Sequence, residues 1–596
     1  MKTPTLKEFM TALKARIDQY THEDLKGIIL AQGMALAPRE RAPFLEEFVL
    51  PEKKEEKKRK QGKDRDDAED FLLKEIASFG RRVEKYEFTS GWGWDDQYGD
   101  ERAWGDDSWA AEIDDLFSRI LDIYGEGNYP LARRAFESLL AIYEEGLEEG
   151  KFSGYDHDEM IETDVDEAKL KYFRCVYLTE TPAGRPQAVW NAISRYSSDA
   201  RDLNIHGIIN VDMEELPQLE DFGQRWPEFL RKQRVSSLSA GLLKEAVSLF
   251  QGVAGLERLA TEDGLRYPSA FIAWLEALKK EHKYEDMIRA ASLGLERLPA
   301  RLQIRSKIAD FLREAAVHLK KEDLIDRSLM EALRADPCLE RLLDTLDNSR
   351  NREKRRAILN ETLAFVETLQ KKEGGSRTRE IDRLPDFWES DVRANLGFYC
   401  HLLKGDYENA AVLLGKSKPL GWSSGEDPGE LGVPFFLLAE WNQGKKLTAN
   451  LSSLWNRATD PALTFSFENF ENDEWNEDED RPDNRRPAKP SSRFRKFLEA
   501  VLKEMPLQAA AKEKYFGLAE KIALKRIDAI VGNKRRKSYW KAAELLLAVA
   551  EVYWSNDRPD EGRALIARVK DKYSRHSAFR GELRNMAKKS GIFAIN

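Results

Sequence analysis

The segment Gly405-Asp-Tyr-Glu-Asn-Ala-Ala-Val-Leu-Leu414 is a turn followed at once by an apolar pattern with helical spacing. Two other segments, residues 127–140 and 282–295, repeat this order, with Tyr129 and Tyr284 directly after the turn. Apolar residues three and four positions apart lie on one face of a helix. A turn-and-helix unit that recurs along a chain predicts an architecture of repeated antiparallel helix pairs.

One copy, Gly127-Asn-Tyr-Pro-Leu-Ala-Arg-Arg-Ala-Phe-Glu-Ser-Leu-Leu140, resembles the second half of a tetratricopeptide (TPR) repeat. Its small residue Ala132 lets paired helices approach, and Phe136 and Leu140 fill the groove between repeats. A degenerate pair follows at residues 545–569. The copies lie far apart, so the resemblance implies an irregular α-solenoid of TPR-like antiparallel helix pairs. The acidic, proline-bearing break at 465–492 adds the expectation of a separate C-terminal helical module. Outside the resemblance, the sequence shows no credible set of strands, and an all-α fold is expected.

The composition describes a chain with a sizeable core. It has 596 residues, of which 41% are hydrophobic and 34% charged, and its 14 Trp, 18 Tyr and 28 Phe exclude disorder throughout. The longest apolar run, residues 433–441, contains a charge and is far shorter than the roughly 18 residues of a membrane span. The N-terminus lacks an apolar signal core, and only three scattered cysteines occur. We therefore expect a cytoplasmic protein that does not bind a membrane.

Charge is distributed unevenly along the chain. Residues 493–596 hold 24 basic and 12 acidic residues, a net charge of +12, so residues 1–492 must carry -22 of the total of -10. Between Glu468 and Asp483 lie nine acids, and prolines follow. These shifts predict the following organisation: a helical unit at 1–50, a charged linker at 51–67, a helical-repeat array at 68–370, a joint at 371–385, a TPR-like unit at 386–464, an acidic linker at 465–492 and a basic helical module at 493–596.

The most unusual stretch is rich in tryptophan and aspartate. Trp92, Trp94 and Trp104 lie within residues 91–109. They form either an acidic, aromatic recognition loop, because Trp is common at binding hot spots, or a loop held to the helices by its indoles. Asp107 or Ser108 is expected to cap a helix that begins near Trp109.

A compact basic cluster, Lys534-Arg-Arg-Lys537, follows a Gly-Asn pair and precedes a helix. Lys534, Arg535, Arg536 and Lys537 are candidate partner-binding residues, together with the three tryptophans. Three uses of this charge remain open: contact with phosphates, contact with an acidic protein, and docking on the protein's own acidic linker.

No catalytic motif is found, and no cofactor or metal is expected. Adjacent residues on a helix point about 100° apart, so Cys400 and His401 do not form a nucleophile and base. The acidic stretch at 156–167 lacks the EF-hand spacing and is expected to be a solvated loop. The chain is therefore expected not to be an enzyme.

The favoured function is a protein-binding adaptor or regulator, with opening or proteolysis of the 465–492 linker as a switch. In size, all-α character and a late linker, the chain is similar to the helical substrate protein that the caspase-like protease of type III-E CRISPR loci cleaves. That resemblance implies a protease and a sigma factor as partners and a role in antiviral signalling. The alternative from another class is nucleic-acid binding through residues 493–596.

Overall fold

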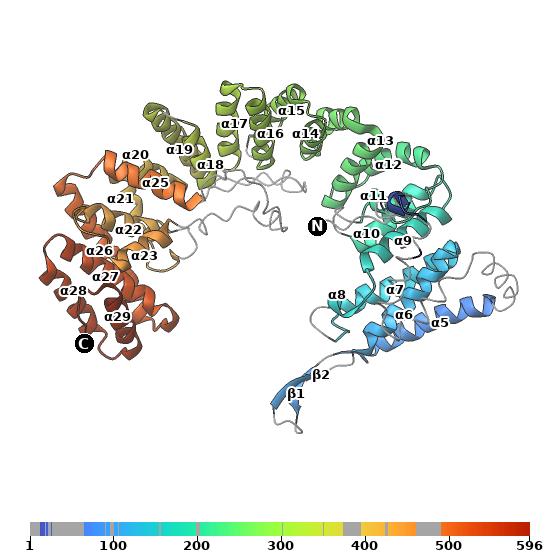
Figure 1. Ribbon diagram of the computed structural model, residues 1–596, viewed down its shortest axis with the longest axis horizontal. Coiled ribbons are helices and arrows are strands. Elements are labelled where there is room, and N and C mark those ends of the chain that lie inside the picture. The colour runs from blue at the N-terminus through green and yellow to red at the C-terminus, as the bar shows by residue number, and fades with distance from the viewer. Residues whose placement is uncertain are drawn as a thin grey trace. The chain divides into compact units, whose positions relative to one another are not determined.

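The computed structural model describes residues 12, 14–17, 19–21, 26, 65–89, 91–95, 100–104, 107–153, 157–197, 203–300, 302–349, 351–372, 395–422, 427–459 and 490–595. The chain forms two compact units, Met1–Ala273 (the N-terminal unit) and Trp274–Asn596 (the C-terminal unit). Both are built of antiparallel helices (Figure 1), so the all-α, solenoid-type fold expected from the sequence is confirmed. None of the described helices is long and apolar enough to cross a membrane.

The N-terminal unit is an array of packed helices, and many of its contacts join helices two positions apart in the chain. α7 packs against α5, α6 and α9, and α12 packs on α10 and α13. α13 is kinked at Gly252, where φ is +62°. The elements are α5 (Arg65–Glu84), α6 (Ser108–Gly125), α7 (Tyr129–Glu148), α8 (His157–Met160), α9 (Val165–Thr179), α10 (Arg185–Tyr196), α11 (Ile205–Asn210), α12 (Leu219–Arg231) and α13 (Ser237–Asp263). α14 (Ala270–Lys280) spans the boundary between the units.

The C-terminal unit continues the series of helix pairs. In its first part the helices pack in chain order, α15 on α16, α16 on α17 and α17 on α18. The elements are α15 (Tyr284–Arg297), α16 (Ile304–His318), α17 (Glu322–Ala335), α18 (Leu339–Asn348), α19 (Arg352–Lys372), α20 (Leu396–Lys404), α21 (Tyr407–Leu414), α22 (Gly429–Glu440), α23 (Ala449–Ala458), α25 (Pro490–Glu504), α26 (Ala509–Gly532), the 3-10 helix η5 (Arg536–Ser538), α27 (Tyr539–Ser555), α28 (Pro559–Lys572) and α29 (Ser577–Ser590).

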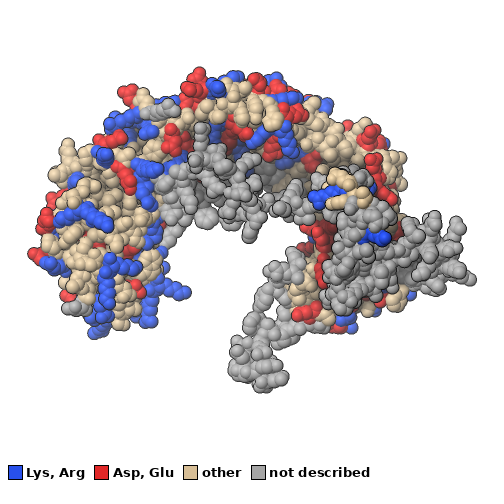
Figure 2. Space-filling view, in the orientation of Figure 1, with Lys and Arg blue, Asp and Glu red and all other residues tan. Residues whose placement is uncertain are grey.

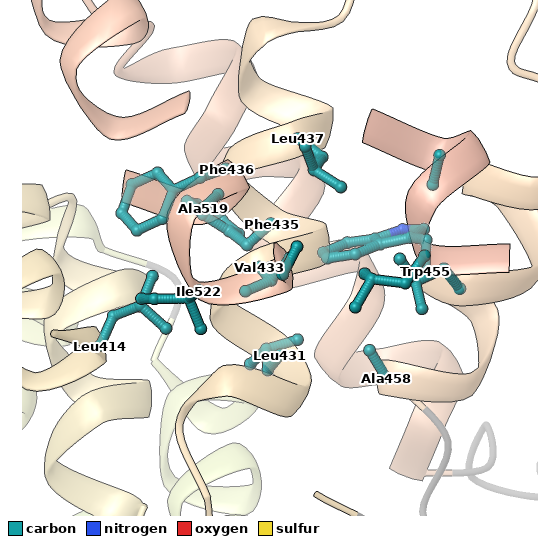
Figure 3. Close-up of a cluster of buried hydrophobic side chains, with 14 of the residues drawn as sticks. Leu414, Leu431, Val433, Phe435, Phe436, Leu437, Trp455, Ala458, Ala519 and Ile522 are labelled. Carbon is teal, nitrogen blue, oxygen red and sulfur yellow. The ribbon is translucent and has the colours of Figure 1, made fainter. Parts of the chain in front are cut away.

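The helices after residue 490 are not separate from those before residue 460. α26 packs on α22 and α27 packs on α23, and one hydrophobic cluster contains buried residues of all four. Figure 3 shows Phe435 and Phe436 of α22 beside Ala519 of α26, with Trp455 of α23 in the same cluster. The expectation of a separate C-terminal module is therefore corrected: its apolar faces are buried against α20–α23 within one compact unit.

One turn geometry recurs between paired helices. A residue with positive φ stands two positions before the next helix, and the residue after it donates its N–H to the carbonyl five positions back, at 2.8–3.2 Å. This is the Schellman end of a helix, in which the left-handed residue lets free carbonyls find donors. The left-handed residues are Gly127, His282, Lys320, Gly405, Lys534 and Asp557. The tyrosines that mark three of these turns in the sequence, Tyr129, Tyr284 and Tyr407, are the first residues of α7, α15 and α21.

The expectation of no strands needs one correction. Gly91–Asp95 (β1) and Asp100–Trp104 (β2) pair as an antiparallel hairpin, which is a two-stranded sheet. Alternating aromatic residues favour a pleated strand, so this stretch forms two strands where a loop was expected. Most of the expected 1–50 unit and of the linkers at 51–67, 371–385 and 465–492 lies outside the described residues, and these boundaries stay predictions.

Candidate functional site

The basic cluster forms the turn between α26 and α27. α26 ends at Gly532, and Lys534 takes a left-handed conformation with φ of +54°. The backbone N–H of Lys534 donates to the carbonyl of Val531, and that of Arg535 donates to Ile530, both at 3.0 Å. These backbone hydrogen bonds satisfy carbonyl groups at the end of α26. The side chains of the four basic residues are therefore not needed to cap the helix.

All four basic residues of this turn are exposed. Among the described residues, no carboxylate oxygen lies within 4.0 Å of the charged groups of Lys534, Arg535, Arg536 or Lys537. Arg493 of the same unit differs, because it pairs with Asp344 and Asp347 at 2.7 Å each. Figure 2 shows Lys and Arg gathered over the part of the C-terminal unit formed by α26–α29.

The end of α28 lies beside the end of α26 and uses the nearest acid. The hydroxyl of Tyr573 donates to Asp528 at 2.7 Å, and Lys572 pairs with the other oxygen of Asp528 at 2.8 Å. Burial raises the pKa of Tyr573, and the hydrogen bond to Asp528 raises it further. Asp528 is therefore engaged and does not neutralise the basic turn.

The register of the β1–β2 hairpin places the three tryptophan positions on two different faces. Trp92 pairs with Ala103, Trp94 pairs with Glu101, and Trp104 pairs with Gly91. Positions 92 and 94 therefore belong to one face of the hairpin and position 104 to the other, because successive residues of a strand alternate between faces. The side chains of these tryptophans lie outside the described part of the structure, so both alternatives for them stay predictions.

α6 begins at Ser108, close to Trp109 as expected, but the expected side-chain cap is not formed by Asp107. Asp107 occupies the N-cap position, yet its carboxylate accepts a hydrogen bond from the Ser153 hydroxyl at 2.6 Å and none from the helix. The indole N–H of Trp109 donates to the same hydroxyl at 3.2 Å, and its ring stacks on Phe152. Trp109 is completely buried. This part of the stretch is structural.

The residues considered for chemistry have structural roles. Cys400 is completely buried, and burial raises the pKa of its thiol, which keeps it protonated. His401 contacts Asp406 at 3.0 Å through Nδ1. In the acidic stretch, Asp164 caps α9 by accepting from the N–H of Glu167 at 2.9 Å. In the described residues, no group of three His, Cys, Asp or Glu side chains is arranged to hold a metal.

Sequence reasoning missed three further basic residues, Lys514, Lys521 and Lys525 of α26, which are exposed on one face of the helix. Their spacing of seven and four residues was a readable signal, because residues at these intervals share a helix face.

No protein-family model matches the sequence, and a search of curated proteins finds no match. Among solved structures, the chain is similar to a "circular tandem repeat protein with novel repeat topology and enhanced subunit contact surfaces". The two are 14% identical, the match covers 82% of this chain and 98% of the other, and the TM-score is 0.13. The assignment of a helical-repeat fold rests on the helix pairs and their common turn described above.

Proposed function

We propose that the protein is a non-enzymatic scaffold of helix pairs that binds protein partners. The observation that carries the proposal is the recurring helix pair with its common turn, which is present in both compact units. Stacks of such pairs expose long surfaces made of successive helices and turns, and these surfaces suit binding to other macromolecules.

The β1–β2 hairpin is the favoured contact for a protein partner. Within the described residues it is a sheet of two strands, so the outer edge of each strand is left without a neighbouring strand. Such an edge offers unpaired N–H and C=O groups to an extended segment of another chain. Trp92, Trp94 and Trp104 belong to this hairpin, and tryptophan is enriched among residues that dominate binding energy.

The test is affinity purification of the intact protein after cross-linking, with wild type compared with a Trp92→Ala, Trp94→Ala double variant. A partner cross-linked to the N-terminal unit is expected to be lost in this variant. The matched control replaces Phe71 and Tyr86, exposed aromatic residues of the same unit, by Ala. If no protein is enriched, or if both double variants retain it equally, the hairpin does not bind a partner as proposed.

Two finer hypotheses rest on the sequence resemblance: cleavage of the 465–492 linker by a caspase-like protease, and control of a sigma factor in antiviral defence. Incubation of the intact protein with the protease of a type III-E system tests the cleavage. A single cut within 465–492 is expected, and an uncut protein contradicts the cleavage and the resemblance on which the second hypothesis rests.

A further inference from the structure

The exposed face of α26 is rich in lysine and glycine. From residue 514 to residue 532, the exposed positions are Lys514, Gly517, Lys521, Lys525 and Gly532. Their separations of three, four, four and seven residues place them along one side of the helix. The opposite side is apolar and buried, and α26 packs with it on α22 and α27.

Three acids of α26 interact with other helices. Glu520 accepts from the Tyr553 hydroxyl at 2.7 Å, and Asp528 is held by Tyr573 and Lys572. Glu513 interacts with Arg558. Within the described residues, no carboxylate oxygen lies within 4.0 Å of the ammonium groups of the three exposed lysines. Asp528 lies on the same side of α26 as the lysines, but it is paired with Lys572, and Glu513 is exposed beside Lys514. The exposed side of α26 therefore carries an excess of positive charge.

The lysine face leads directly into the basic turn. The helix rises about 1.5 Å per residue, so the face from residue 514 to residue 532 is about 27 Å long. The turn then adds four cations at its C-terminal end. We call these seven residues the basic ridge: Lys514, Lys521, Lys525, Lys534, Arg535, Arg536 and Lys537.

Gly517 supports the idea that an external surface approaches the ridge. A glycine inside an exposed helix costs about 0.5–1 kcal/mol relative to alanine. A Cβ at this position would meet nothing within 4 Å, so packing within the protein does not require the glycine. A missing side chain lets another molecule come close to the helix backbone.

We propose that the basic ridge binds the phosphate backbone of duplex DNA. The lysines of the ridge lie on the exposed side of the helix α26, and the major groove of B-DNA, about 12 Å wide, admits a helix between two rows of phosphates. Lysines placed along such a helix neutralise phosphates and release counterions, which supplies binding energy without sequence recognition. This activity goes beyond the proposed binding of protein partners, and it can fail while that function holds.

Two observations favour duplex DNA over other acidic partners. Protein interfaces are depleted of lysine and rely on apolar or aromatic anchors, and none of the described large hydrophobic residues that are exposed lies between residues 490 and 595. Single strands bind by stacking bases on exposed aromatic rings. Tyr515, Tyr539 and Tyr573 are buried, and Trp540 is half-buried beside Arg457 and Lys541.

The test measures binding of the intact protein to a short fluorescent duplex DNA of mixed sequence, by fluorescence anisotropy across a salt series. Affinity is expected to fall steeply with salt, with a logarithmic slope of about -0.9 for each phosphate contacted. If all seven cations of the basic ridge make contact, the slope approaches about -6.

A triple variant tests the lysine face itself. Lys514→Gln, Lys521→Gln and Lys525→Gln together should lower the magnitude of the salt slope by about 3 and the affinity by roughly tenfold or more. The matched control, Lys280→Gln, Lys320→Gln and Lys321→Gln, removes the same charge from exposed positions elsewhere in the unit and should bind like the unchanged protein. Unchanged melting temperatures show that both variants keep the fold.

Three results would overturn the proposal. The first is no binding to duplex DNA at the lowest salt, and the second is an equal loss in both triple variants. The third is tighter binding to single-stranded DNA or to polyglutamate, which would assign the ridge to unpaired strands or to an acidic polypeptide.

Discussion

Glu245 of α13 holds the start of α11 by accepting two backbone hydrogen bonds. The N–H of His206 donates to it at 2.5 Å and that of Ile205 at 3.2 Å. Burial raises the pKa of Glu245 from its ordinary 4.5 to about 7, although the two hydrogen bonds lower it in part. The folded protein therefore holds a proton on this carboxyl at pH values where the unfolded chain has lost it.

The expected consequence is a fall in stability as the pH rises from about 4.5 to about 7, because folding retains a proton across this interval. The contribution is at most on the order of 3 kcal/mol, since one pKa unit corresponds to about 1.4 kcal/mol. Glu245→Gln cannot titrate and should remove this part of the pH dependence. Chemical unfolding of both proteins at pH 4.5 and at pH 7 measures it, and an unchanged difference between the two pH values would contradict the assignment.

Lys320 is a non-glycine residue in the left-handed region, with φ of +55°. A residue with a side chain is destabilised by about 1–2 kcal/mol in this region. Lys320→Gly should remove this strain but increase the entropy of the unfolded chain, so the free energy of unfolding should rise by up to roughly 1 kcal/mol. The opposite exchange, Gly405→Ala, should destabilise, because φ is +74° and the new Cβ would lie 2.7 Å from Cε of Met505. Denaturant titrations compare the two, and a destabilised Lys320→Gly protein would show that the turn does not carry this strain.

At the scale of elements, α26 and α28 each contain a glycine, with different consequences. Gly517→Ala should stabilise the protein by up to about 1 kcal/mol, because alanine is the better helix former and its Cβ meets nothing. Gly562→Ala should destabilise it, because the Cβ would lie 2.8 Å from the carbonyl oxygen of Ala550 and 3.1 Å from Cζ of Phe593. Thermal unfolding measures both, and equal effects would mean that packing does not distinguish the sites.

At the scale of the C-terminal unit, buried polar contacts join α23 to α27 and hold the parts of the chain on either side of the acidic linker together. The completely buried carboxylate of Glu551 accepts from the Thr448 hydroxyl at 2.5 Å and from the Asn450 amide at 2.6 Å. Arg457 pairs with the buried Glu544. A buried carboxylate that lost these donors would be costly, because its desolvation would no longer be compensated.

A cut within residues 465–489 is therefore expected to leave the C-terminal helices bound. With a protease site inserted there, the cleaved protein should elute as one particle in size-exclusion chromatography and separate only in denaturant. The shared hydrophobic cluster supplies most of the cohesion. A C-terminal fragment that elutes alone under native conditions would show that the C-terminal helices form a separate module after all.

Local patterns in the sequence were enough to predict the helix pairs, their turns and the basic cluster. A Schellman turn is made by a few consecutive residues, so Gly127 and Gly405 predict it from the local sequence alone. The start of α6 near Trp109 followed from local spacing in the same way.

Only the tertiary structure decided which charges remain free and which helices share a core. Lys572 and Lys521 look alike in the sequence, yet Lys572 pairs with Asp528, whereas no described carboxylate oxygen lies within 4.0 Å of the Lys521 ammonium group. The net charge of +12 after residue 492 favoured a separate C-terminal helical module. In the structure, however, the apolar faces of α26 and α27 are buried against α22 and α23. Ion pairing and core sharing depend on residues far apart in the chain, and a charge count along the sequence cannot place them.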